Sequence, residues 1–285
     1  MDIRQSDHYL KFMESIGWIV ERVGTTNIFI RKIGPTSVIK IQRPEKLNLG
    51  GIEKIVRKYH PLLIKIEPNT KYRIQNTEYS PDNWPLLPTK TLLLNLNMDL
   101  NFLPKDTRYE IRKSMNISLS LRKSNDTELF YELLEETMKI GGWSVPIKKE
   151  VVNLYKSFQP NNSVILMVST VNREPDSTVN IPVAACLLIW DKDTAHYMYA
   201  ALTQKGRELG AAYFLLWEAI QFLQEKKLKY LDLEGIYDER YPKQTKHWQG
   251  FTKFKMAWGG QVVQYPGSFV KYANPIIAWL FKLTT

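Results

Sequence analysis

The chain has 285 residues, enough for two domains that each bury a core of their own. Apolar residues make up 44% and charged residues 24%, which excludes a disordered chain. Lysine and arginine total 39 against 29 aspartate and glutamate residues, a formal net charge of +10. This charge makes a polyanion such as RNA or a phosphate-bearing lipid a reasonable partner, although a solubilising surface charge explains it equally well.

The first predicted unit covers residues 1–104, and the C-terminal segment 268–285 is a candidate to complete it. Helices are expected over residues 7–16 and from Gly50 onward. Alternating and apolar runs predict strands near 18–23, 27–33, 36–42, 61–67 and 92–96. This order of elements indicates an α/β unit.

The second predicted unit covers residues 105–267, after the composition turns basic between Leu103 and Ser124. Helices are expected over about 126–140 and 148–158. Strands over 163–170 and 181–190, which flank a polar loop at 172–180, lead into a third strand at 195–202. A helix from Gly210 to about Lys226 then precedes a strand at 229–233, so that a β-α-β crossover and a mixed sheet are predicted.

Cys186 is the only cysteine and lies in an apolar run. It cannot form an intramolecular disulfide, and we expect a core thiol in a reducing compartment. The N-terminus has no apolar signal segment, and no apolar run approaches the ~18 residues of a membrane-spanning helix. A cytoplasmic location is predicted. The apolar tail 275–281 favours a packed terminal helix over contact with a bilayer surface.

Familiar catalytic signatures are missing from the sequence. There is no Walker loop, Cys-x-x-Cys pair or Gly-x-Ser-x-Gly elbow. The four histidines, His8, His60, His196 and His247, show no metal-ligand spacing, and no metal site is expected.

The segment Arg207-Glu208-Leu209-Gly210-Ala211-Ala212 fits the Arg-x-x-Gly-x-Ala loop by which GNAT acyltransferases present backbone N–H groups to pyrophosphate. A helix N-terminus offers unpaired N–H donors and a positive dipole, which suits an anion. A plain helix start, with glycine for close packing, explains the segment equally well.

Three further segments follow in order: Tyr197-Met198-Tyr199-Ala200-Ala201, Tyr230-Leu231-Asp232-Leu233-Glu234-Gly235-Ile236 and Gly250-Phe251-Thr252-Lys253-Phe254-Lys255-Met256-Ala257-Trp258-Gly259-Gly260. This series resembles the FemABX family of tRNA-dependent aminoacyltransferases that build peptidoglycan bridges. Upstream segments at 5–18, 43–44, 64–68 and 108–113 are similar to the family as well. Glu234 stands where the family usually has glycine, and the chain has no room for the coiled-coil arm of some members.

The resemblance implies two GNAT-like domains, each a mixed, mostly antiparallel sheet flanked by helices. It also implies transfer of an aminoacyl group from aminoacyl-tRNA to an amine of a peptidoglycan precursor, without a cofactor. On this basis the Phe254-Lys255 pair is catalytic, because an ammonium stabilises the negative charge that develops on the carbonyl oxygen. Without the resemblance, a solvated lysine in a basic run would be the better reading.

Asp232 and Glu234 lie two apart on a strand, so we expect them on one face, where they hold or deprotonate the attacking ammonium or simply form a capping pair. Tyr197 and Tyr199 are expected to share a face and line the acceptor site, although packing explains one of them as well. Arg207 and Gly210 complete the predicted substrate site. Phosphate contacts with RNA are assigned to Lys226, Lys227, Lys243, Lys246 and Lys253.

Two positions depart from family members that act on the UDP-linked precursor. Met13 and Asp193 stand where those members have a lysine and an arginine that grip the diphosphate. We therefore expect a lipid-linked precursor, which leaves peripheral contact with the inner membrane face open as an option. A monomer is expected independently of these two positions. The alternatives are an acyl-CoA-dependent N-acyltransferase of the GNAT type and a non-catalytic binder of RNA or anionic lipid.

Overall fold

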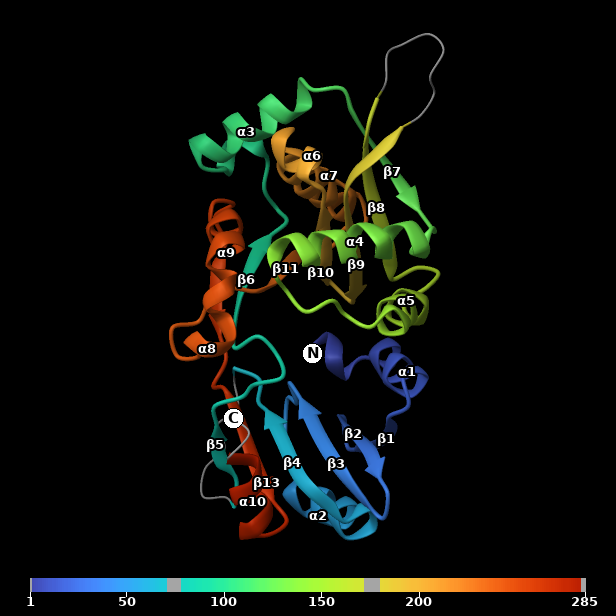
Figure 1. Ribbon diagram of the computed structural model, residues 1–285, viewed down its shortest axis with the longest axis vertical. Helices are drawn as coiled ribbons and strands as arrows, with labels where there is room; N and C mark the ends of the chain where they lie inside the picture. Colours follow the sequence, from blue (N-terminus) through green and yellow to red (C-terminus); the bar gives the residue numbers. More distant parts are fainter. Residues whose placement is uncertain (1, 71–77, 172–179, 283–285) are drawn as a thin grey trace. The chain divides into compact units, whose positions relative to one another are not determined.

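The computed structural model describes residues 2–70, 78–171 and 180–282 (Figure 1). The chain forms two compact units. The first comprises residues 1–91, 235–249 and 263–285, and the second comprises residues 92–234 and 250–262. Most of the polar loop expected at 172–180 lies outside the described residues.

The first unit is built on a six-stranded mixed sheet in the order β1-β2-β3-β4-β13-β5. Its strands are β1 (Ile19–Val23), β2 (Thr26–Ile33), β3 (Thr36–Gln42), β4 (Pro61–Glu67), β5 (Ser80–Asp82) and β13 (Ser268–Tyr272). Its helices are α1 (Asp7–Ser15), α2 (Leu49–Tyr59), α8 (Pro242–Thr245) and α10 (Pro275–Lys282). Only β3 and β4 among the registered pairs of this sheet run parallel, and α2 connects them.

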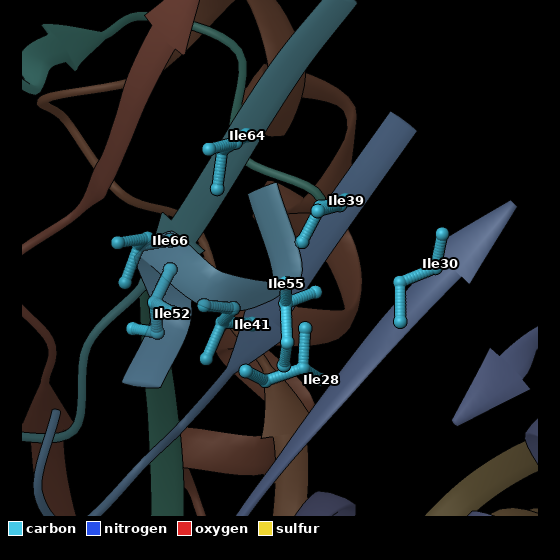
Figure 2. Packing of buried hydrophobic residues seen from close by; sticks show 8 residues of the cluster. All are labelled: Ile28, Ile30, Ile39, Ile41, Ile52, Ile55, Ile64 and Ile66. Atoms are coloured by element: carbon cyan, nitrogen blue, oxygen red, sulfur yellow. The ribbon is translucent and has the colours of Figure 1, made fainter. Parts of the chain in front are cut away.

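Isoleucine dominates the core of the first unit. Figure 2 shows the side chains of β2, β3 and β4 meeting those of α2 in one cluster of eight isoleucines: Ile28, Ile30, Ile39, Ile41, Ile52, Ile55, Ile64 and Ile66. The strand members alternate along each strand, as a sheet with one face on a helix requires. The helix begins where the Asn48 side chain accepts a hydrogen bond from Gly51 N at 3.0 Å.

The second unit is built on a seven-stranded sheet in the order β12-β6-β11-β10-β9-β8-β7. Its strands are β6 (Lys90–Asn95), β7 (Leu119–Ser124), β8 (Ser163–Thr170), β9 (Ile181–Asp191), β10 (Thr194–Leu202), β11 (Tyr230–Gly235) and β12 (Gln261–Gln264). Its helices are α3 (Lys105–Met115), α4 (Thr127–Gly141), α5 (Lys148–Ser157), α6 (Gln204–Glu208), α7 (Ala211–Glu225) and α9 (Gln249–Met256).

The strands β7 to β10 form an antiparallel meander, and the chain then crosses through α6 and α7 to β11, which pairs in parallel with β10. Helices α4 and α7 both pack against the central strands, with α4 in front of them and α7 behind them in Figure 1. Because both faces are covered, β8 and β9 read as continuous apolar runs and are buried along most of their length. Cys186 is fully buried among them, as predicted.

The predicted mixed α/β class is confirmed, but the two compact units differ from the domain boundary expected between residues 104 and 105. The divide falls between Thr91 and Leu92, because β6 joins the second sheet and its Leu92 and Leu94 are buried there. Residues 235–249, expected in the second domain, belong to the first unit. The C-terminal segment does join the first unit, where β13 pairs with β4.

The apolar tail forms helix α10, in which Ile277 and Ala278 are half-buried. Ile276 is 70% exposed and Trp279 is 60% exposed. Within the described ranges, every helix is too short or too polar to cross a bilayer.

Candidate active site

The carboxylates of Asp232 and Glu234 lie at the C-terminal end of β11, in the middle of the second sheet. Glu234 has a φ of 60°, a left-handed backbone conformation that is unfavourable for a residue with a Cβ atom. Oδ1 of Asp232 accepts a hydrogen bond from Glu234 N at 2.7 Å and supports this turn. The two residues are 5% and 9% exposed, so these acidic groups are nearly withdrawn from water.

His196 joins this pair from the neighbouring strand. In the parallel register of β10 and β11, His196 lies directly beside Asp232. Its Nδ1 is 2.7 Å from Oε1 of Glu234, and its side chain is buried. When Glu234 is ionised, its carboxylate only accepts hydrogen bonds, so in that state Nδ1 carries the hydrogen. His196 was not expected as a site residue, because its proximity to Asp232 follows from strand order and register rather than from spacing along the chain.

A β-bulge in β10 places Tyr197 and Tyr199 on opposite faces of the sheet. Tyr197 pairs with Leu188 of β9, whereas Tyr199 pairs with Leu187, and Met198 is the extra residue between them. The expectation that the two tyrosines share a face is therefore wrong, since directly paired residues point to the same side and neighbours in β9 alternate.

Tyr199 lies on the face that carries His196, because their partners in β9, Leu187 and Ile189, are two apart. Burial, together with the charges of Glu150 and Glu234, raises the pKa of Tyr199 to about 12. Tyr197 lies on the other face, where burial and then the neighbouring Cys186 raise the pKa of its phenol well above the usual value. Tyr199 thus belongs with the acidic pair, and Tyr197 belongs to the core beside Cys186.

Lys255 reaches the same group of charges from α9. Its side chain is half-buried, and its Nζ lies 4.8 Å from the centre of the Phe251 ring. Burial lowers the pKa of the Lys255 ammonium to about 8, while the charges of Glu234 and Asp232 oppose that shift. A partly desolvated ammonium beside two carboxylates interacts with a developing charge more strongly than a solvated lysine does.

Phe254 points to a different environment from its neighbour Lys255. Its ring lies 5.1 Å from that of Tyr213 of α7 and 6.1 Å from that of Trp258, centre to centre. Trp258 is 1% exposed and stacks with Tyr213. Phe254 therefore anchors α9 to α7, and this packing fixes the helix that carries Lys255.

The donor atoms of His196, Asp232 and Glu234 lie within 4.8 Å of one another, a spacing compatible with a metal ion. However, the Glu234 oxygen is already hydrogen-bonded to His196 Nδ1, and Lys255 supplies positive charge to the two carboxylates. A metal would have to displace that hydrogen bond and share the site with an ammonium. The donor set fits a hydrogen-bonded group of acids and bases better than a metal centre.

The predicted anion loop lies at the start of α7. Gly210 has a φ of 64° and is the N-cap of this helix, without a side chain that caps it, whereas Arg207 is exposed at the end of α6. The preceding Gly206 is required for close packing, because a Cβ atom there would lie 2.2 Å from Val183 O. Gly206 lies outside the predicted loop, however, and at Gly210 a Cβ atom would come no closer than 4.0 Å to Ser114 Cβ. The positive φ of Gly210, rather than close packing, therefore accounts for the glycine of the loop.

The lysines assigned to RNA are all exposed: Lys226, Lys227, Lys243, Lys246 and Lys253. A cavity of about 370 Å³ in the first unit is lined by Ile19, Lys32, Gly34, Pro35, Thr36, Lys58, Tyr59 and His60. It contains none of the site residues expected from the sequence.

The chain is similar to a family of proteins in sequence and to several solved structures in fold. Residues 147–285 match the model of the FemAB family. A crystal structure of FemX superposes with a TM-score of 0.80 and 14% identity, over 99% of this chain and 94% of that one. The C-terminal domain of a putative lysylphosphatidylglycerol synthetase from Agrobacterium fabrum superposes with a TM-score of 0.65 and 10% identity, over 99% of this chain and 93% of that one.

A tandem GNAT protein from the clavulanic acid biosynthesis pathway gives a TM-score of 0.50 at 10% identity, over 89% of this chain and 82% of that one. These superpositions agree with the two GNAT-like units expected from the sequence. No curated protein sequence matches this chain closely enough to count as a relative.

Proposed function

We propose that this protein, whose residues 147–285 match the model of the FemAB family, transfers an aminoacyl group from a charged tRNA to an amine of a peptidoglycan precursor. The match to this family supports the general class of reaction, which is aminoacyl transfer in the formation of peptidoglycan cross-bridges. The chain is accordingly a transferase. The donor, the acceptor and the residue roles given below are the specific parts of the proposal.

The position of Lys255 carries the proposal. Lys255 is half-buried, and its ammonium is coupled by charge to Glu234 and Asp232 at the end of β11. When an amine attacks an aminoacyl ester, the carbonyl oxygen becomes negative, and a fixed ammonium stabilises that state more than the neutral ester. The carboxylates are suited to hold the acceptor ammonium before it loses its proton.

An aminoacyl ester on tRNA is already activated, so the transfer requires neither ATP nor a metal ion. The exposed lysines Lys226, Lys227 and Lys253 of the second unit are available to tRNA phosphates, as are Lys243 and Lys246 of the first unit. With a charged tRNA as the donor, the reaction belongs in the cytoplasm.

We propose a lipid-linked acceptor. Met13, which stands where a phosphate-binding lysine is found in members that use the UDP-linked precursor, is 1% exposed and belongs to the core of the first unit. Asp193 stands where those members have an arginine, and it pairs with Lys229 at 3.2 Å. Neither residue is suited to grip a diphosphate. The exposed Ile276 and Trp279 of α10 provide apolar side chains for peripheral contact with the membrane face.

The test is incubation of the purified protein with a pool of charged tRNAs and either lipid-linked or UDP-linked precursor, followed by mass analysis of the precursor. The proposal predicts a mass increase of one amino-acid residue on the lipid-linked precursor. Micromolar binding of the UDP-linked precursor would overturn the choice of acceptor. Turnover with acetyl-CoA and none with charged tRNA would overturn the choice of donor.

A further inference from the structure

We infer that Glu234 and His196 act as a pair in which Glu234 accepts and returns the proton of the attacking amine and His196 positions the Glu234 carboxylate. This inference rests on the proposed function, because it assigns the proton transfer within that reaction. Under this assignment Glu234 is a catalytic residue, and His196 is a positioning residue that acts through it.

The geometry of the pair is specific. The 2.7 Å hydrogen bond joins two residues that are 38 positions apart and lie on adjacent parallel strands. The His196 side chain is 5% exposed, whereas that of Glu234 is 12% exposed. The carboxylate is thus the more accessible member, and the imidazole holds it from the protein interior.

The backbone of Glu234 is part of the same arrangement. A φ of 60° costs free energy for any residue except glycine, and Asp232 stabilises the turn through the hydrogen bond from Glu234 N. Because Glu234 is in the left-handed conformation, its side chain leaves the backbone in another direction than it would if β11 continued as a regular strand. The protein retains an unfavourable backbone conformation at the position where the carboxylate meets His196, which indicates a use for that carboxylate.

Ionisable groups from β10, α9 and β11 itself interact with Glu234. His196 and Tyr199 come from β10, Lys255 comes from α9, and Asp232 precedes it in β11. Glu150 of α5 contributes to the same field through its effect on Tyr199. The pair therefore lies in a site that contains both a base and a cation, which are the two elements that aminolysis of an ester requires.

The chemical step balances with these residues alone. The neutral amine attacks the ester carbonyl and forms the C–N bond, and Lys255 stabilises the negative oxygen. The positively charged nitrogen then gives one proton to Glu234. The C–O bond to the tRNA ribose breaks, and the leaving oxygen takes that proton back from Glu234. The products are an amide and a ribose hydroxyl, and Glu234 is again a carboxylate.

The experiment measures kcat, KM and their pH dependence for four proteins, with charged tRNA and lipid-linked precursor as substrates. These are the wild type, Glu234→Gln, His196→Leu and His196→Asn. Glutamine keeps the shape of Glu234 and an oxygen for His196, but it cannot accept the proton. Asparagine at 196 keeps an N–H donor near the position of Nδ1, whereas leucine removes it. Circular dichroism and thermal unfolding of each variant establish that it is folded.

Glu234→Gln is expected to lower kcat by roughly 10²- to 10⁴-fold, with little change in KM and with loss of the acidic limb of the wild-type pH profile. His196→Leu is expected to lower kcat by about 10²-fold and to move that limb to higher pH, because the carboxylate loses a hydrogen-bond donor. His196→Asn is expected to restore most of the rate and the original limb.

Wild-type activity together with an unchanged kcat in folded Glu234→Gln would overturn the inference while leaving the proposed function intact. An equal loss in His196→Leu and His196→Asn, without any shift of the pH profile, would overturn the role given to His196. Loss of wild-type activity on chelation and its recovery with added Zn²⁺ would also overturn the roles given to Glu234 and His196. These two residues would then form a metal site together with Asp232. Absence of transfer by the wild type would instead reject the proposed function itself, on which the pair depends.

Discussion

The ring of Phe254 lies 5.1 Å from that of Tyr213, at an interplanar angle of 73°. This edge-to-face contact joins α9 to α7, and the next residue in α9 is Lys255. The position of the lysine therefore depends on this aromatic contact.

Replacement of Phe254 with alanine should lower both stability and activity. Removal of the ring, which packs against Tyr213 and Trp258, is expected to cost about 3 kcal/mol of unfolding free energy, since the ring is half-buried rather than fully enclosed. Urea denaturation measures this cost. Tyr213→Phe keeps every ring contact and serves as the control. If Phe254→Ala is as stable as the control, the anchoring role is wrong.

The difference in stability between Lys255→Met and the wild type should depend on pH. The pKa of Lys255 is lowered from 10.5 to about 8 in the folded protein, so the unfolded chain binds this proton more tightly. Below about pH 8, burial of the charged Lys255 ammonium therefore lowers the free energy of unfolding of the wild type. This destabilisation disappears as the pH rises from about 8 toward 10.5. Lys255→Met lacks this cost.

We therefore expect Lys255→Met to be at least as stable as the wild type at pH 7, with an advantage that shrinks between about pH 8 and 10. Thermal unfolding at a series of pH values measures the difference. A variant that is clearly less stable than the wild type at pH 7, and that gains no relative stability as the pH falls from about 10 to 8, would show that the ammonium is not partly desolvated.

Much of the fold could be predicted from the sequence, because alternation and apolar runs report local structure directly. The apolar runs of β8 and β9 and the crossover through α7 are examples. The site could be predicted only in part. Asp232 and Glu234 follow from strand position, but the proximity of His196 depends on which strands are neighbours. The bulge at Met198, which separates Tyr197 from Tyr199, has no signal in the sequence pattern.

Replacement of Arg207 with alanine distinguishes a tRNA-dependent reaction from an acyl-CoA-dependent one. Arg207 is exposed at the end of α6, three residues before Gly210, whose φ is 64°. We expect Arg207→Ala to retain transfer from charged tRNA and to show no turnover with acetyl-CoA, as the wild type should. Steady-state kinetics with both donors measures this. If the wild type turns over acetyl-CoA and Arg207→Ala raises the KM for acetyl-CoA strongly, the result would favour the pyrophosphate loop.

Removal of the charges of Lys226 and Lys227 together should weaken tRNA binding. Both are exposed at the end of α7. For each phosphate that is no longer neutralised, the slope of log Kd against log salt should fall by roughly 0.7 to 0.9, which filter binding at several salt concentrations measures. The double variant Lys54→Gln, Arg57→Gln removes the same charge from exposed positions of α2 and serves as the control. Equal slopes in the two double variants would show that only net charge matters.

The most direct test of the central claim is the single-turnover rate of aminoacyl transfer from charged tRNA to lipid-linked precursor, compared between the wild type and Lys255→Met. The structure predicts a fall of roughly 10²- to 10³-fold with unchanged tRNA affinity, because the ammonium stabilises the transition state rather than the bound substrate. A folded Lys255→Met protein that transfers at the wild-type rate would contradict the account.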